Sequence, residues 1–158
     1  MAADMKESVL VSQEVNMAQS IREVMTANPI CLPANTSVQQ AAREMRDNDV
    51  GDVIVEKDGG LYGIVTDRDI VVRVIAEGKD VTTTDLEAIC SRNLATLTPD
   101  QTVKDATQLM KDKALRRIPV VEEDGKGKVI GIVSIGDIAV EKHPKSALGK
   151  ISAASANT

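Results

Sequence analysis

The chain has 158 residues, a formal net charge of -5 and 42% hydrophobic residues, which suits one globular domain or two small repeats that share a core. With one tyrosine and neither phenylalanine nor tryptophan, it lacks an aromatic platform for single-stranded nucleic acid, and its negative charge gives no general attraction for phosphate backbones. One histidine and two cysteines without CxxC spacing exclude a multi-histidine zinc site and the common redox motifs. No signal-peptide pattern and no apolar run of about 18 residues is present, so we expect a soluble cytoplasmic protein without a membrane partner.

The first predicted elements follow a small, polar N-terminal segment (1–16). A short helical turn is expected at 21–25 and an extended stretch at 29–32. Ser37 then begins a helix, because its hydroxyl can cap backbone N–H groups while Gln40 reaches back as in a capping box. The apolar residues of this helix follow the spacing of one buried face: Val38, Ala41, Ala42 and Met45.

Two strands and a closing helix come next. The stretches 53–56 and 61–65 are rich in β-branched residues and are separated by an Asp-Gly pair, which is a hairpin signal. A helix is predicted from Asp67 to Ala76, with Gly78 as its C-cap.

The same series of elements occurs a second time after a linker at 79–84. Val38, Ala41, Met45 and Val55 recur, in order, as Val103, Ala106, Met110 and Val120. The second copy has a helical turn at 86–90, an extended stretch at 94–97, a helix opening on Thr102 with Asp105 as its capping box, strands at 118–121 and 129–133, and a helix at 135–142. The chain therefore holds two copies of a β-α-β-β-α unit of about 60 residues. One copy alone cannot bury its apolar surfaces, so we expect an α+β fold in which two pseudo-symmetric repeats pack through their sheets into one module.

The residues of the repeat resemble a known family. The segments Met25–Pro29, Arg116–Val121, Gly63–Asp69 and Gly131–Asp137 carry the resemblance. Together they resemble the CBS domain, the small regulatory unit named after cystathionine β-synthase, over residues from about 20 to 142. The chain looks like a stand-alone bacterial tandem CBS protein, or Bateman module. The expected boundaries are a flexible tail at 1–16, repeat 1 at 17–78, the linker at 79–84, repeat 2 at 85–142 and a flexible tail at 143–158.

This resemblance implies regulation rather than catalysis. The family binds adenosine-type ligands (AMP, ADP, ATP, in some members NAD or S-adenosylmethionine) in two clefts between paired repeats, and it signals through the geometry of disc-shaped dimers. We expect a homodimer that senses energy state, an unidentified protein partner, no nucleic acid, no required cofactor and no metal. The chain also has no nucleophile–base pair and no Gly-rich phosphate loop, so we expect no enzyme activity. Ligand identity, the occupied cleft and dimer orientation stay open.

The candidate ribose ligands are Thr66 and Asp69 in repeat 1, and Ser134 and Asp137 in repeat 2. A carboxylate can accept both ribose hydroxyls, and the hydroxyl one turn earlier can add a hydrogen bond; in the family the matching Asp holds the ribose. The same Thr/Ser-x-x-Asp pattern also caps helices. We expect both roles at once.

The candidate phosphate ligands are arginines, because the net charge of the chain opposes anions. Arg68 lies inside the first ribose motif, and Arg116-Arg117 precede a strand, where the family often places basic contacts. The repeats differ here: Gly136 stands where repeat 1 has Arg68, and Gly51-Asp52 stand where repeat 2 has Arg116-Arg117. The two clefts should therefore differ in ligand or affinity. Which arginine serves which cleft, or is an ordinary surface residue, stays open.

Further candidate residues are apolar or polarisable. The resemblance places an adenine slot at Thr26, Pro29, Ile30, Val53, Ile118 and Pro119, and ordinary core packing is an equal interpretation of each. Cys31 and Cys90 are expected to be small buried residues, with a disulfide or a metal role left open. His143 suits the end of the last helix. A non-catalytic interaction or scaffold dimer with vestigial clefts is the alternative function.

Overall fold

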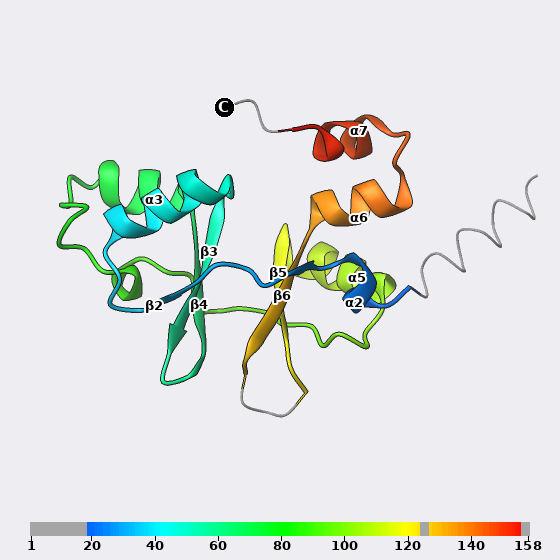
Figure 1. Ribbon diagram of the computed structural model, residues 1–158, viewed down its shortest axis with the longest axis horizontal. Helices are drawn as coiled ribbons and strands as arrows, with labels where there is room; N and C mark the ends of the chain where they lie inside the picture. Colours follow the sequence, from blue (N-terminus) through cyan, green and yellow to red (C-terminus); the bar gives the residue numbers. More distant parts are fainter. Residues whose placement is uncertain (1–18, 124–126, 156–158) are drawn as a thin grey trace, which may run out of the picture. The chain divides into compact units, whose positions relative to one another are not determined.

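The computed structural model describes residues 19–123 and 127–155 (Figure 1). These form two three-stranded sheets and their covering helices, which confirms the predicted α+β class. Two compact units result. Of the described residues, unit 2 holds 28–94, 122–123 and 127–130, and unit 1 holds 19–27, 95–121 and 131–155. The predicted tail at 1–16 lies outside the described residues.

Unit 2 is built on the sheet β2–β3–β4. β2 (Cys31–Pro33) pairs in parallel with β3 (Asp52–Lys57), and β3 pairs antiparallel with β4 (Gly60–Thr66). Asp58 and Gly59 join the hairpin with φ angles of 53 and 80°, as a two-residue turn of this type requires. The helices of the unit are α3 (Val38–Asn48), α4 (Asp67–Ile70), its π-helical continuation η1 (Val71–Ile75) and the short 3-10 turn η2 (Leu86–Ala88).

Unit 1 is built on the three-stranded sheet β1–β6–β5. β1 (Thr26–Ala27) pairs antiparallel with β6 (Val129–Ser134), which also pairs with β5 (Arg117–Val121). Its helices are α2 (Ile21–Val24), α5 (Val103–Lys113), α6 (Ile135–Lys142) and α7 (Ala147–Ala153). No helix in the described ranges is long and apolar enough to cross a membrane.

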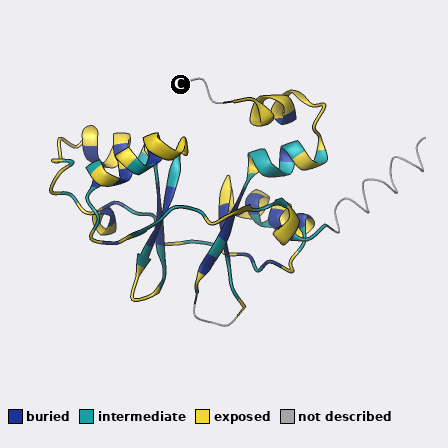
Figure 2. Ribbon diagram, in the orientation of Figure 1, coloured by how far each residue is buried: buried dark blue, intermediate teal, exposed yellow. Residues whose placement is uncertain are grey.

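The predicted helix faces are confirmed except at one position. Val38, Ala41 and Met45 of α3 are buried, and the matching residues of α5 are buried as well (Figure 2). Ala42 is exposed, contrary to the prediction. At about 100° of rotation per residue, Ala42 falls on the opposite side of Val38 from Ala41 and Met45, outside the stripe that meets the sheet.

The helix caps show a second difference from prediction. The Thr102–Asp105 box forms in full, since the hydroxyl accepts from the Asp105 N–H and the carboxylate accepts from the Thr102 N–H. At Ser37 only half of the box forms: Ser37 Oγ accepts from Gln40 N at 3.2 Å, but Gln40 Nε2 donates to Glu44 Oε1 at 3.0 Å. The Gln40 side chain lies along its own helix, where its amide N–H donates to a carboxylate, so its oxygen is not used to accept from the Ser37 N–H as a full capping box requires.

The openings of the two repeats are exchanged between the units. Leu86 and Ile89, from the start of repeat 2, belong to the core formed by α3, β3 and β4 of repeat 1. In unit 1, the start of repeat 1 pairs with repeat 2, with Thr26 opposite Ile132 and the Ile21 N–H donating to Gln101 O at 2.8 Å. Each unit is therefore completed by the opening segment of the other repeat.

A C-terminal helix stands where a flexible tail (143–158) is expected. Ser146 is the N-cap of α7, and its Oγ accepts from Gly149 N at 3.0 Å and donates to His143 O at 2.7 Å. Gly149 is buried, and a Cβ at this position would collide with His143 O and lie 3.0 Å from Ala139 O. The sequence carries a weak helix signal here because glycine disfavours helices. In the structure, the missing Cβ of this glycine allows the close approach of α7 to α6.

We expect Gly149→Val to release α7 from α6, because the atoms that the new Cβ would meet all belong to the backbone carbonyl groups of His143 and Ala139. Amide exchange at 147–153 should speed up at least tenfold, with little change in global stability since α7 buries little else. Exchange mass spectrometry measures this. Ala147→Val, at an exposed position of the same helix, is the matched control, and equal exchange in the two variants would contradict the docking.

Candidate functional site

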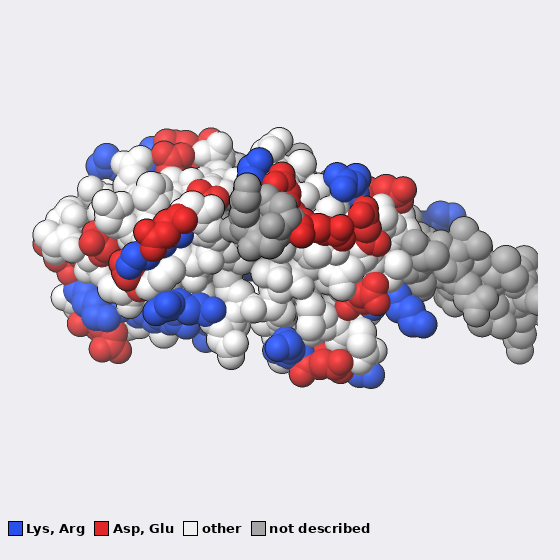
Figure 3. Space-filling model, turned by 90° about the horizontal axis from the view of Figure 1, so that it is seen from below, with Lys and Arg blue, Asp and Glu red and all other residues white. Residues whose placement is uncertain are grey.

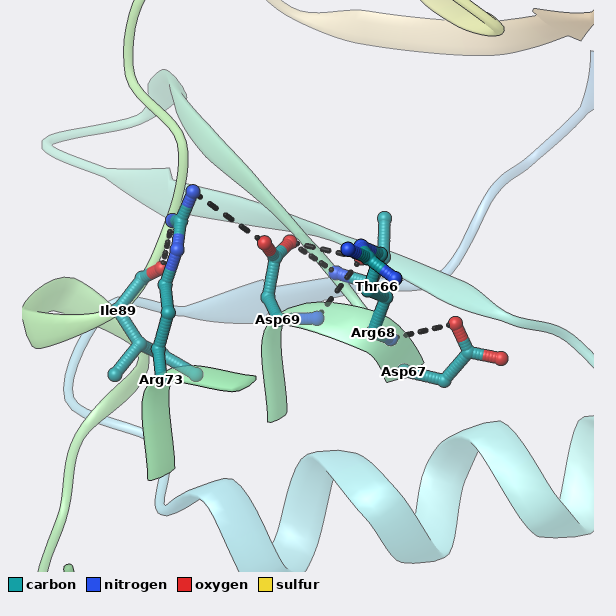
Figure 4. Close-up of polar contacts among 6 residues, drawn as sticks. All are labelled: Thr66, Asp67, Arg68, Asp69, Arg73 and Ile89. Atoms are coloured by element: carbon teal, nitrogen blue, oxygen red, sulfur yellow. Dashed lines mark hydrogen bonds and ion pairs between the residues drawn. The ribbon is translucent and has the colours of Figure 1, made fainter. Parts of the chain in front are cut away.

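The Thr66–Asp69 motif of unit 2 forms a closed capping box (Figure 4). Thr66 ends β4 and is the N-cap of α4, so its Oγ1 accepts from the Asp69 N–H at 3.2 Å. Asp69 Oδ2 accepts from both the N–H and the hydroxyl of Thr66, each at 2.9 Å. The helix cap thus uses one carboxylate oxygen. The second oxygen, Oδ1, is 3.4 Å from Arg73 Nη2.

The Ser134–Asp137 motif of unit 1 has the same construction. Asp137 Oδ2 accepts from Ser134 N at 2.7 Å and from Ser134 Oγ at 2.8 Å, and Ser134 Oγ accepts from Asp137 N at 3.1 Å. The helix-cap role expected of both motifs is therefore confirmed. Each motif also holds its aspartate in a fixed orientation at the junction of a strand and a helix, with one carboxylate oxygen beyond the needs of the cap.

The candidate arginines divide between the two boxes. Arg68 is the second residue of α4 and is exposed. Arg116 and Arg117 are also exposed, and they lie beside the other box because Arg116 O accepts the first N–H of α6, from Ile135, at 2.9 Å. Gly51 O makes the matching contact, to Asp67 N at 3.0 Å. One arginine thus accompanies the Thr66–Asp69 box and two accompany the Ser134–Asp137 box.

The predicted adenine-slot residues also divide between the units. Pro29, Ile30 and Val53 lie in unit 2 with the Thr66–Asp69 box, while Thr26, Ile118 and Pro119 lie in unit 1 with the Ser134–Asp137 box. Thr26 belongs to repeat 1 in the sequence but lies in unit 1, because β1 pairs with β6 of repeat 2. The side chains of Val53 and Ile118 are 0% exposed. Both residues are therefore packed in the core of their unit, which favours the core-packing interpretation at these two positions.

Arg73 is a site-neighbouring residue that the motifs alone did not reveal. It follows Asp69 by one helical turn, and its guanidinium contacts both Asp69 and the carbonyl of Ile89. The i,i+4 spacing of an acid and a base on a predicted helix was the available signal. The contact with Ile89 had no signal in the sequence, because it depends on the exchanged opening of repeat 2.

The two cysteines are free thiols of intermediate burial. Burial is the largest cause that raises the pKa of Cys31 to about 11, and the nearby Glu56 carboxylate adds to it. Burial also raises the pKa of Cys90. No group of three or more His, Cys, Asp or Glu within 19–123 and 127–155 is arranged to hold a metal ion.

We expect Cys31 to alkylate slowly at pH 8, since the thiolate is the reactive form and a pKa near 11 leaves about 100-fold less of it than a pKa near 9. Iodoacetamide labelling of a Cys90→Ser variant, followed over pH 7 to 11, measures this. The rate should still be rising at pH 10. The same raised pKa makes the thiol's contribution to stability full below pH 9 and lost as the pH rises through 11. A plateau of the labelling rate below pH 9 would contradict this assignment.

On the face shown in Figure 3, basic and acidic side chains are intermixed, so this face offers no single field for a polyanion.

The chain belongs to the CBS domain family. The family model described as "CBS domain" matches residues 21–76 and 86–143, the two repeats. A pair of such domains is a regulatory module. The CBS domain-containing protein YhcV of Bacillus subtilis is 34% identical over 130 residues, which cover 82% of this chain and 90% of YhcV.

Two solved structures add ligand and assembly information about relatives. The CBS domain pair of protein MJ0100, solved with 5'-methylthioadenosine and S-adenosyl-L-methionine, has a TM-score of 0.68 and 27% identity, covering 77% of this chain and 94% of that one. A hexameric CBS-CP12 protein from bloom-forming cyanobacteria has a TM-score of 0.68 and 30% identity, covering 77% and 67%.

Proposed function

We propose that this protein is a ligand sensor that binds adenosine-type molecules at the Thr66–Asp69 and Ser134–Asp137 boxes. The outer carboxylate oxygen of each box accepts ribose hydroxyls, while the inner oxygen keeps the helix cap. The observation that carries the proposal is that this division of labour occurs, with nearly the same distances, at the two matching junctions where β4 leads into α4 and β6 into α6. Hydrogen bonds to an ionised acceptor are strong enough to select a diol.

The two boxes are proposed to differ in ligand. Arg68 accompanies the first box and Arg116 with Arg117 the second, so a phosphorylated ligand (AMP, ADP, ATP or NAD) would meet one or two guanidinium groups. A ligand with an uncharged or sulfonium tail, such as 5'-methylthioadenosine or S-adenosylmethionine, would bind with less dependence on these arginines. MJ0100, which was solved with two ligands of this kind, supports including them.

Calorimetric titration tests the proposal. AMP, ADP, ATP, NADH, S-adenosylmethionine and adenosine are each titrated into the protein to millimolar concentration. At least one should bind, and at 100 times its dissociation constant it should stabilise the fold by about 2.7 kcal/mol, which thermal unfolding detects. Absence of heat from all six would reject the ligand-sensing function.

Signalling is proposed to run through a homodimer. Val71, Val72 and Ile75 of η1 are 58%, 46% and 58% exposed, an apolar face that a second copy could cover. The hexameric CBS-CP12 protein supports self-association in the family. Sedimentation with and without ligand measures it. A protein that sediments as a monomer at every concentration, with and without ligand, would contradict both dimer signalling and the alternative of a scaffold dimer.

A further inference from the structure

Arg73 joins the first box to a distant segment of unit 2. Its Nη2 lies 3.4 Å from Asp69 Oδ1, and its Nη1 donates to the carbonyl oxygen of Ile89 at 2.6 Å (Figure 4). The side chain of Asp69 is only 15% exposed, against 44% for Arg73. The guanidinium is a rigid, planar fork, so the two contacts fix each other's geometry.

The segment that Arg73 holds is itself tied to the end of the sheet. Ser91 N donates to Ile64 O at 2.9 Å, and Ile64 N donates to Ser91 O at 3.1 Å. Ile64 lies on β4, the strand that ends in Thr66. A closed path of contacts therefore runs from the carboxylate of Asp69 through Arg73, Ile89 and Ser91, and back along β4 to the box.

The second box has no such path. The residue one turn after Asp137 is Glu141, an acid, which accepts from Gln19 Nε2 at 3.0 Å. Within the described parts of the chain, Asp137 makes no ion pair. The two carboxylates thus have the same cap but a different charge beside the outer oxygen.

We infer that Arg73 is the positioning residue of the Thr66–Asp69 site and that it links occupancy of this site to the segment from Ile89 to Ser91. The inference rests on the proposed binding of a ribose at Asp69. The guanidinium fixes the direction in which Oδ1 faces a hydroxyl. A hydroxyl that shares Oδ1 changes the hold of Arg73 on the Ile89 carbonyl, so ligand binding at this site, and not at the other, alters the 89–91 segment.

The test uses the full chain with Asp137→Ala, so that only the first site remains. Adenosine and 2'-deoxyadenosine are titrated into this protein and into its Arg73→Gln and Arg73→Lys versions. Loss of an ion pair of this exposure is expected to weaken adenosine binding about threefold to tenfold. The preference for adenosine over the deoxy nucleoside should shrink by a similar factor in Arg73→Gln, because a loosely held carboxylate discriminates less between one hydroxyl and two. Arg73→Lys keeps the charge but cannot make both contacts, so it should restore affinity only in part.

Amide exchange at 89–91 supplies the second readout. Adenosine should change exchange there in the parent protein and leave it unchanged in Arg73→Gln. Arg46→Gln, which removes another exposed ion pair of unit 2, to Asp47, is the matched control and should behave as the parent in both measurements. If the parent binds adenosine and Arg73→Gln keeps both the affinity ratio and the exchange response, the inference is overturned while the proposed function stands. If the parent protein does not bind adenosine, the proposed binding of a ribose at Asp69 is itself rejected.

Discussion

Gly63→Ala is expected to lower the free energy of unfolding by about 2–3 kcal/mol, whereas the matching change in the other repeat, Gly131→Ala, should cost about 1 kcal/mol. The two glycines occupy the same place in their strands, and each admits the exchanged opening of the other repeat. A Cβ on Gly63 would lie 2.7 Å from Cys90 Sγ, 2.9 Å from Cys90 Cβ and 3.0 Å from Ser91 O. The Ser91 carbonyl and the Cys90 Cβ cannot move aside without breaking the hydrogen bonds between the backbones of Ser91 and Ile64.

At Gly131 the nearest atoms belong to a more adaptable neighbour. The new Cβ would collide with Met25 Sδ and lie 3.0 Å from Met25 Cγ, with Thr26 O at 3.2 Å. Methionine has three rotatable bonds and can repack, so most of the overlap can be relieved. Urea unfolding of both variants measures the difference. Adding Met25→Ala to Gly131→Ala should recover part of the loss, while Cys90→Ala should recover little at Gly63, since its Cβ remains. Equal costs at the two glycines would contradict the contact geometry.

Replacing Asp69 and Asp137 by alanine together is expected to abolish adenosine binding, with each single change weakening its own site at least tenfold. An ionised acceptor of hydroxyl groups contributes about 1.5–3 kcal/mol per hydrogen bond, which corresponds to about 10- to 150-fold in affinity. The helix caps are lost as well, so each change should also lower stability by about 1 kcal/mol. Binding is measured by calorimetry at a temperature where both variants are folded.

Asp105→Ala separates the two effects. The Thr102–Asp105 box has the same arrangement as the other two, with Asp105 Oδ2 accepting from Thr102 N and Oγ1 at 2.8 Å each, but it begins α5 and is not a ribose candidate. This variant should show the same loss of stability and unchanged ligand binding. If it lost binding to the same extent as Asp69→Ala, the effect would come from general destabilisation and the ribose role would be rejected.

Local signals in the sequence predicted most of the elements. The capping residues Thr66, Thr102 and Ser134 begin the helices expected of them, and the Asp58-Gly59 turn adopts the positive φ angles that its hairpin requires. These features depend on residues a few positions apart. The spacing also predicted that the two aspartates would be held at helix N-termini. Their role toward a ribose stays a prediction, since it depends on a molecule that the chain does not contain.

The features that sequence reasoning did not find depend on contacts between distant residues. The exchange of the repeat openings has no periodic signature, because Leu86 and Ile21 are apolar in either arrangement. The contact of Arg73 with Ile89 follows from that exchange. α7 was missed for a related reason: its glycine is unfavourable in an isolated helix and favourable only where another helix end comes close.

The exchanged openings also set the order in which this protein can fold as it is made. Thr26 cannot pair until Ile132 has been synthesised, and the Leu61 N–H cannot donate to Gly127 O until Gly127 has been synthesised. An N-terminal half released early would expose an unpaired β1 and the empty place for Leu86 and Ile89. Domains that fold during synthesis usually do so from the N-terminus onward, one unit at a time. Here the core residues of unit 2 lie between Ala34 and Ile89 and are all synthesised before β6, so unit 1 is the unit that must wait for the later part of the chain.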